Sequence, residues 1–143
     1  MIIPDANLLI YAYDTASPYH RKAKTWWEHT LSQPEPVGIP WVVLIGFTRI
    51  ITHPQICENP YSVEEAENVV SSWFDMPQTQ MIRLSNHAWR QFFGLLKEAG
   101  IGGNLTTDAT IVLHAMEHSA TVHTNDLDFQ RFSGIRMVYP LND

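Results

Sequence analysis

The first fourteen residues, MIIPDANLLIYAYD (1–14), contain a complete change of secondary structure. The β-branched residues Ile2 and Ile3 predict a short buried strand, and the apolar run that starts at Leu8 predicts a helix. The polar break between them places Asp5 just beyond the carboxyl end of the strand, where open α/β sheets bind ligands. Taken alone, the segment also fits a purely structural interpretation, with Asp5 in a turn and Asn7 as the helix N-cap.

The composition is that of an ordinary globular protein. With 143 residues, of which 45% are hydrophobic, the sequence predicts a single domain over residues 1–143 that buries a sizeable core. We expect no membrane partner and a cytoplasmic location, because no apolar run is long enough to span a bilayer and the start lacks the features of a signal peptide. Cys57, the only cysteine, excludes an intramolecular disulfide and is expected to be a loop or packing residue.

The charge balance is acidic. Nine basic and fifteen acidic residues give a net charge of −6, which argues against a dedicated high-affinity DNA-binding protein. A nuclease remains compatible with this charge, because acids gathered around divalent cations lower the net charge without repelling the substrate. The nearest approach to a basic patch is Arg21, Lys22 and Lys24, which we interpret as a solvated helix face.

Strands and helices are expected to alternate along the rest of the chain. Further strands are predicted at 37–39, 81–84, 121–124 and 135–139, and helices after Ser17, Pro40, Ser62, Ser85 and either Thr106 or Thr107. The segment WVVLIGFTRII (41–51) has the composition of a strand, but Pro40 favours a buried helix. The order predicts an α/β fold of three layers, with a mainly parallel sheet of about five strands flanked by helices.

Four aspartates are expected at one edge of this sheet. Asp5 follows the first strand, Asp126 and Asp128 follow the fourth, and Asp108 lies in the first turn of the helix that precedes the fourth strand. Each alone fits a turn or a favourable position at a helix start. Together they would raise one another's pKa and resist ionisation unless a cation filled the cluster. Carboxylate oxygens without cysteine suit Mg²⁺ or Mn²⁺, which would activate water for an in-line displacement.

Four segments carry a resemblance to a known family: IIPDANLLIYAYD (2–14), WVVLIGFTRI (41–50), GNLTTDATIVLHAMEHSATVHTND (103–126) and DFQRF (128–132). Together they resemble PIN-domain nucleases, specifically the VapC-type toxins of bacterial toxin–antitoxin pairs. The resemblance covers essentially the whole chain. It implies a three-layer PIN-like fold and an endoribonuclease that cleaves RNA with Mg²⁺, for which Mn²⁺ is a substitute. It also implies inhibition by a small cognate antitoxin and suggests a homodimer.

The resemblance assigns roles to the acids. Asp5, Asp108 and Asp126 match the catalytic and metal-binding carboxylates, and Asp128 matches a supporting metal ligand. One departure concerns the helix predicted at 41–51, where such nucleases usually carry a glutamate and this sequence has Gly46. A complete site of that kind is therefore in question, and a catalytically weak PIN fold that only binds RNA or an antitoxin is the alternative function.

Three further residues match auxiliary positions. The resemblance implies that Asn7 and Thr124 orient metal-bound water or an acid. Arg49 is expected to contact RNA or an acidic residue of the antitoxin, with an ion pair on the helix surface as its structural alternative. The apolar segments around Trp26, Trp27 and Trp41 are expected to be mainly core, and some of them would line a groove for an amphipathic antitoxin helix.

Two other enzyme classes have partial motifs. His114, Glu117 and His118 form the pattern H-x-x-E-H of one zinc-protease group, but only 25 residues follow His118, which leaves little room for a helix with a third ligand. An aspartyl phosphatase would need an acid at the third position of Asp5-x-Asp, and Asn7 stands there. Both interpretations are weaker than the nuclease.

Overall fold

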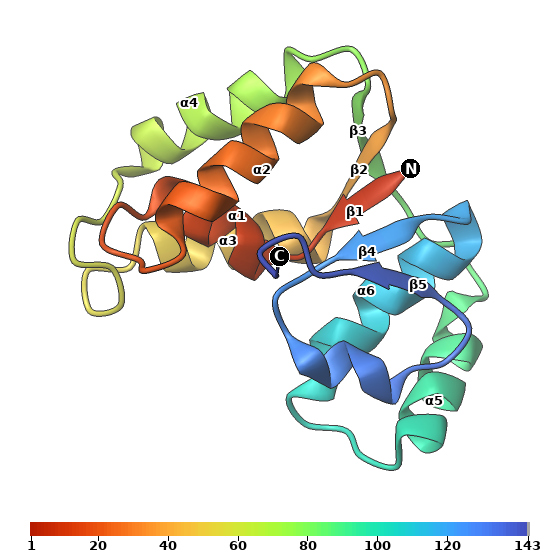
Figure 1. Ribbon diagram of the computed structural model, residues 1–143. Coiled ribbons are helices and arrows are strands. Elements are labelled where there is room, and N and C mark those ends of the chain that lie inside the picture. The colour runs from red at the N-terminus through yellow and green to blue at the C-terminus, as the bar shows by residue number, and fades with distance from the viewer. Residues whose placement is uncertain (143) are drawn as a thin grey trace.

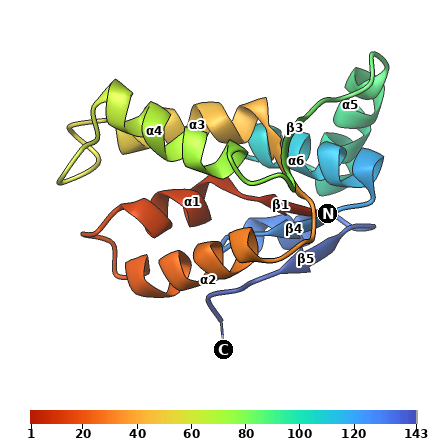
Figure 2. The same ribbon diagram turned by 90° about the horizontal axis from the view of Figure 1, so that it is seen from above.

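Five parallel strands form one sheet in the computed structural model, which describes residues 1–142. The strands are β1 (Ile2–Pro4), β2 (Val37–Pro40), β3 (Thr79–Ile82), β4 (Thr121–His123) and β5 (Arg136–Val138), in the order β3-β2-β1-β4-β5. The helices are α1 (Ala6–Tyr13), α2 (His20–Ser32), α3 (Trp41–Ile51), α4 (Val63–Phe74), α5 (Ala88–Ala99) and α6 (Leu105–His118), followed by the 3₁₀ helix η1 (Leu127–Arg131). Helices α2 and α6 lie on opposite faces of the sheet (Figures 1 and 2), which confirms the predicted three-layer α/β fold.

The strand order places the start of the chain at the centre of the sheet. Strand β1 pairs with β2 on one side and with β4 on the other, in the register Ile2↔Thr121 and Pro4↔His123. The connections run outward from β1 through β2 to β3, and then cross back to β4 and β5. The boundary between β1 and β4 is therefore a topological switch point, and the carboxyl ends of both strands open at the same edge.

An aromatic cluster packs helices α1, α2, α3 and α4 against one another. The fully buried rings of Phe47 in α3 and Trp73 in α4 have centroids 4.8 Å apart, and Trp27 in α2 packs edge-on against Trp73 at 5.6 Å. The Trp73 indole N–H donates a 2.9 Å hydrogen bond to the Tyr13 hydroxyl at the end of α1. Burial of each such side chain contributes about 1.5–3 kcal/mol, so the cluster fixes α1 between its neighbours.

Several local predictions from the sequence are confirmed. Residues 41–51 are helical, and Ser62 forms a capping box with Glu65, in which each side chain accepts a hydrogen bond of 3.0 Å from the other residue's backbone. Gly100 ends α5 in the left-handed conformation, with φ of 76°, which favours glycine. Cys57 is buried and its thiol donates to the Ile50 carbonyl, which is a packing role.

Four helix starts differ from the prediction, those of α1, α2, α5 and α6. Helix α2 begins at His20, two residues later than expected, because the chain first makes a turn in which the Ser17 hydroxyl accepts from the Tyr19 N–H. Helix α6 begins at Leu105, so neither Thr106 nor Thr107 is its cap, and the Thr106 hydroxyl donates to the Gly103 carbonyl instead.

Asn7 is also not the N-cap of α1. It lies inside the first turn of the helix, and Asp5 holds the N-cap position without a side-chain capping bond. The Ser85 prediction was wrong in the same way, because α5 starts at Ala88 after His87. In both cases the sequence predicted that a short polar side chain caps the helix, whereas the backbone geometry puts another residue at the N-cap position.

Strand β3 is displaced from its predicted position at 81–84. It covers Thr79–Ile82, because the register with β2 pairs Val37 with Thr79 and Pro40 with Ile82. The pairing partner thus decides the bounds of this strand, and the local composition does not. None of the helices over residues 1–142 combines the length and the apolar character needed to span a bilayer.

Candidate active site

Asp5 is a buried carboxylate at the switch point. Its backbone N–H donates a 2.8 Å hydrogen bond to the His123 carbonyl, which extends the contact between β1 and β4 by one residue. Only 6% of Asp5 is exposed, and its Oδ2 accepts a 2.8 Å hydrogen bond from the Thr124 hydroxyl. Because Thr124 directly follows β4, this hydrogen bond ties the carboxylate to the ends of both central strands.

A chain of hydrogen bonds continues from Thr124 through the following turn. The same hydroxyl oxygen accepts from the Asp126 N–H at 3.0 Å, and Asp126 Oδ1 accepts from the Asp128 N–H at 2.9 Å. Asp126 therefore caps η1, which is the turn-forming role expected for it from composition. The structural and the functional interpretations of Asp126 are compatible, because only one of its oxygens is used in this contact.

Asp108 completes the group of acids. It lies in the first turn of α6 and is partly buried. Burial and the charges of Asp5, Asp126 and Asp128 raise the pKa of Asp108 to about 7. The charges of all three act on Asp108, so Asp5, Asp126 and Asp128 each lie within electrostatic range of it. Repulsion between these like charges is the energetic cost expected of a carboxylate cluster that holds no cation.

Burial also raises the pKa of Asp5. The hydroxyl of Thr124 and the N–H groups of Ala6 and Asn7 act in the opposite direction, while the charge of Asp126 adds to the rise. Without the Thr124 hydroxyl, ionisation of Asp5 would be still less favourable.

The oxygen donors suit a hard divalent cation. Among residues 1–142, no three His, Cys, Asp or Glu side chains are grouped so that they could hold an ion as they stand. Mg²⁺ does not need such a cage, since it keeps several waters and takes one or two carboxylates together with substrate phosphates. Two coupled carboxylates, Asp5 and Asp108, meet that requirement, so the residues present fit Mg²⁺.

Gly46 borders this site. A Cβ atom built on it would lie 3.4 Å from the Cβ of Ala6, an ordinary contact, and no other atom would lie within 4 Å. Ala6 directly follows Asp5, so the position that lacks a glutamate in this chain faces the start of α1. A Cβ atom at position 46 would therefore fit without a clash.

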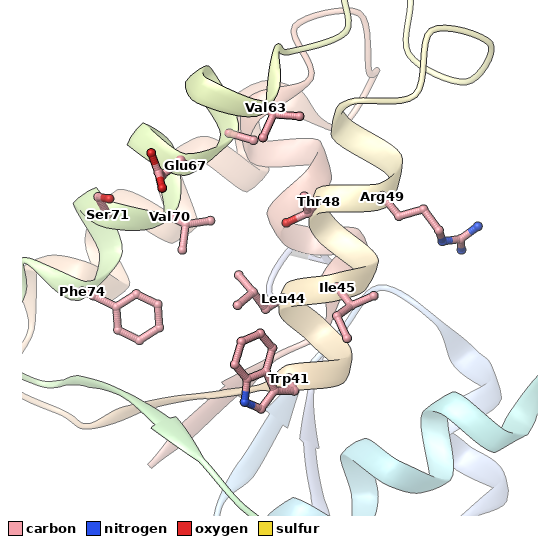
Figure 3. Close-up of a pocket in the computed structure, with 11 residues that line it drawn as sticks. Trp41, Leu44, Ile45, Thr48, Arg49, Val63, Glu67, Val70, Ser71 and Phe74 are labelled. Atoms are coloured by element: carbon pink, nitrogen blue, oxygen red, sulfur yellow. The ribbon is translucent and has the colours of Figure 1, made fainter.

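The auxiliary residues are placed differently from one another. Thr124 is fully buried and bonded to Asp5, whereas Asn7 is exposed on α1. Arg49, in the last turn of α3, extends away from α4 (Figure 3). Within the described part of the chain it forms no ion pair, so the expected helix-surface pair is absent there. The roles predicted for Asn7 and Arg49 stay predictions.

In the described part of the chain, the H-x-x-E-H residues do not form a metal site, although the rings of His114 and His118 stack with centroids 6.5 Å apart. His114 is buried, and Glu117 accepts hydrogen bonds of 2.8 Å and 2.7 Å from the N–H and hydroxyl of Ser85. His118 Nε2 lies 3.1 Å from the Arg83 carbonyl oxygen. The glutamate therefore closes the turn before α5, and no third ligand joins the two histidines in residues 1–142.

An apolar groove lies between α3 and α4 (Figure 3). Its volume is about 610 Å³, and Leu44, Val70 and Phe74 face into it. Trp41 lines one end with 60% of its surface exposed. This surface matches the groove predicted from the tryptophans.

The other two tryptophans do not line this groove. Trp27 is 2% exposed and belongs to the core. The Trp26 indole N–H donates a 3.1 Å hydrogen bond to Nδ1 of His123 in β4.

The sequence did not predict that α4 forms the second wall of the groove. It also did not single out Arg131, whose only signal is its place three residues after Asp128.

Replacement of Thr124 by valine is expected to reduce RNA cleavage about tenfold, because the resemblance makes Asp5 a metal ligand and loss of a residue that orients such a ligand has effects of this size. Valine keeps the volume of threonine but cannot donate to Asp5 Oδ2. Thr124→Ser keeps the hydroxyl and is the matched control. RNA cleavage and Mg²⁺ affinity measured for both variants would test this, and equal losses in serine and valine would contradict it.

Comparison with known proteins places the chain in a family. The PIN domain matches residues 2–135. Ribonuclease VapC33 of Mycobacterium tuberculosis is 34% identical over 143 residues, which is the full length of both chains. Ribonuclease VapC37 of the same species is 34% identical over 140 residues, or 98% of this chain and 97% of the relative. The chain therefore belongs to the PIN domain family, within its VapC group.

Solved structures agree in fold. Mycobacterium tuberculosis VapC20, a toxin that cleaves the sarcin–ricin loop, has a TM-score of 0.69 at 16% identity, covering 95% of this chain and 99% of that one. VapBC2 from Rickettsia felis, bound to a DNA fragment of its promoter, has a TM-score of 0.67 at 20% identity, covering 96% and 98%.

Proposed function

We propose that this protein is an Mg²⁺-dependent endoribonuclease that acts as the toxin of a toxin–antitoxin pair. The observation that carries the proposal is the buried Asp5 carboxylate, joined to Thr124 by a 2.8 Å hydrogen bond at the switch point of the sheet. Asp108 and Asp126 lie within electrostatic range of it. Relatives that share 34% of its sequence are ribonucleases of the VapC group, which supports the same activity here.

Each residue of the site has a separate role in this proposal. Asp5 and Asp108 would hold the ion, with Asp126 and Asp128 as supporting carboxylates. A divalent cation at such a site activates water and stabilises the charge of an in-line displacement at a phosphate. Thr124 fixes the orientation of the Asp5 carboxyl and favours its ionised form, which is the form that binds a cation.

The proposal is tested by incubating the purified protein with labelled RNA in Mg²⁺, in Mn²⁺ and in EDTA. We expect internal cleavage with either ion and none in EDTA. Preparations of Asp5→Asn, purified in parallel, control for contaminating nucleases. If no RNA is cleaved in either ion, the alternative of a PIN fold that only binds RNA or an antitoxin is favoured, and Gly46 supplies its structural reason.

We also propose that the groove between α3 and α4 binds an amphipathic helix of the antitoxin. Several structural neighbours are toxin–antitoxin complexes, among them VapBC2 from Rickettsia felis and VapBC from Salmonella typhimurium. The apolar walls around Leu44, Val70 and Phe74 suit the apolar face of a helix. Basic side chains on the same antitoxin would be attracted to the four aspartates.

Replacement of Trp41 by alanine is expected to weaken antitoxin binding about tenfold or more, since exposed aromatic anchors dominate such contacts. Cleavage of RNA should be unchanged, because the groove that Trp41 lines includes none of the four aspartates. The matched control is Trp89→Ala, which removes an equally exposed tryptophan from α5. Binding of the cognate antitoxin, measured by calorimetry, would check this, and an equal loss in both variants would contradict the assignment.

A further inference from the structure

A second cavity lies beside the acids, between the loop before α6 and the 3₁₀ helix η1. Its volume is about 390 Å³, within the range of small-ligand sites. Residues 101–105 line one side, and Asp128 and Arg131 line the other. In Figure 1 the blue turn of η1 lies beside the loop that joins α5 to α6. The cavity therefore continues directly from the carboxylate group, through Asp128.

The wall formed by the loop is open backbone. Gly102 and Gly103 carry no side chains, and a Cβ atom placed on either would meet no atom within 4 Å. Gly103 has a φ of +56°, a conformation that side chains other than glycine rarely adopt. The exposed side chain of Ile101 adds an apolar surface at one end. Such a wall allows close approach of a bulky ligand.

Arg131 is the cation of this cavity, and it has no partner within residues 1–142. It forms no ion pair and no hydrogen bond there, although Asp128 lines the same cavity. A planar guanidinium left free in this way can pair with both oxygens of a phosphate. Arg136, by comparison, already donates to the Ser119 carbonyl.

We propose that this cavity binds the RNA phosphate next to the one that is cleaved, and that Arg131 is the residue that pairs with it. The inference rests on the proposed ribonuclease function and names a substrate contact for it. A single-stranded RNA whose scissile phosphate lies at the carboxylates must pass over a neighbouring surface, and the carboxylates repel its other phosphates. Arg131 supplies the opposite charge at the first cavity beyond Asp128.

The test measures RNA binding without cleavage. Arg131→Ala is introduced into an Asp108→Asn background, and the affinity for a fluorescein-labelled, single-stranded oligoribonucleotide of mixed sequence is followed by anisotropy over a series of salt concentrations. We expect about a tenfold loss of affinity. The slope of log K against log salt should fall by about 0.7, the value for one phosphate of a single strand.

Two variants complete the design. Arg131→Lys should recover most of the salt slope, because it keeps the charge. Arg136→Ala, at the first residue of β5 and outside the lining of this cavity, should leave both affinity and slope unchanged. In the cleaving protein, Arg131→Ala should raise KM about tenfold and leave kcat nearly unchanged, as expected of a residue that binds substrate away from the reacting atoms.

Binding by Arg131→Ala that equals its background, or a loss that Arg136→Ala shares, would overturn the proposal. The result is separable from the ribonuclease proposal. If the wild type cleaves no RNA, the nuclease assignment fails, yet the anisotropy and salt slope still decide whether Arg131 binds RNA phosphate. If cleavage is normal and the slope is unaltered, only the Arg131 subsite fails.

Discussion

Replacement of Asp108 by asparagine is expected to reduce RNA cleavage about a thousandfold. The change removes a carboxylate that would hold the ion, and the ion's electrostatic stabilisation of the transition state is weakened as a result. The same change should raise the melting temperature of the metal-free protein at about pH 8. The reason is that burial and the charges of Asp5, Asp126 and Asp128 raise the pKa of Asp108 to about 7. Above that pH, Asp108 is ionised and its charge is repelled by those three neighbours.

Asparagine keeps the shape of the side chain and removes one of these charges. Because Asp108 is only partly buried, solvent screens much of the repulsion, and we expect a gain of about 2 °C. Differential scanning calorimetry in EDTA would measure it. Asp75→Asn, an exposed change at the end of α4, is the matched control and should alter neither melting nor cleavage. A variant that cleaves normally, or that melts lower than the wild type, would contradict this role of Asp108.

Addition of Mg²⁺ to the metal-free protein is expected to raise its melting temperature by about 8 °C at about pH 8, at a concentration of 100 times Kd. At about pH 5 the effect should be small, since protonated carboxyls do not bind the ion. EDTA should abolish cleavage in parallel. An increase that is equal at both pH values, or that persists in Asp5→Asn, would show that the ion binds elsewhere.

The pH dependence of the metal-free protein follows from the same groups. The pKa of Asp108 rises from 3.8 to about 7, so its protonated form stabilises the fold below 3.8, and this contribution is lost as the pH rises through about 7. His114 acts in the opposite direction. Burial lowers its pKa from 6.5 to about 4, so its contribution is present above 6.5 and is lost as the pH falls. Between about pH 6.5 and 7, of these two contributions only that of Asp108 still changes, so a decline in stability there reports this carboxyl.

The fold was predictable because its decisive features are local. Ile2 and Ile3 are followed at once by a polar break, so the end of β1 and the position of Asp5 can be assigned from a few residues. The same is true of the capping box at Ser62 and Glu65. Strand β3 was displaced by two residues, because its bounds are set by pairing with β2, which is distant in sequence.

For the candidate site, the sequence predicted only that several aspartates lie at the same edge of the sheet. Parallel strands share one carboxyl edge, so Asp5 and Asp126 could be placed together from strand order. The contact between Thr124 and Asp5 joins residues 119 positions apart, and composition gives no sign of it. Its role came from family resemblance. Arg131 was missed for the same reason, since its cavity forms between η1 and a loop from another part of the chain.

RNA cleavage by Asp5→Asn, compared with the wild type purified in parallel, tests the proposed metal site most directly. Asparagine retains an oxygen that can accept the hydrogen bond of Thr124, so the fold should be preserved, and circular dichroism would verify this. We predict that the wild type cleaves RNA in Mg²⁺, stops in EDTA and recovers when Mg²⁺ is added in excess, whereas Asp5→Asn stays inactive throughout. Cleavage by Asp5→Asn at the wild-type rate would contradict the assignment of Asp5 as a metal ligand.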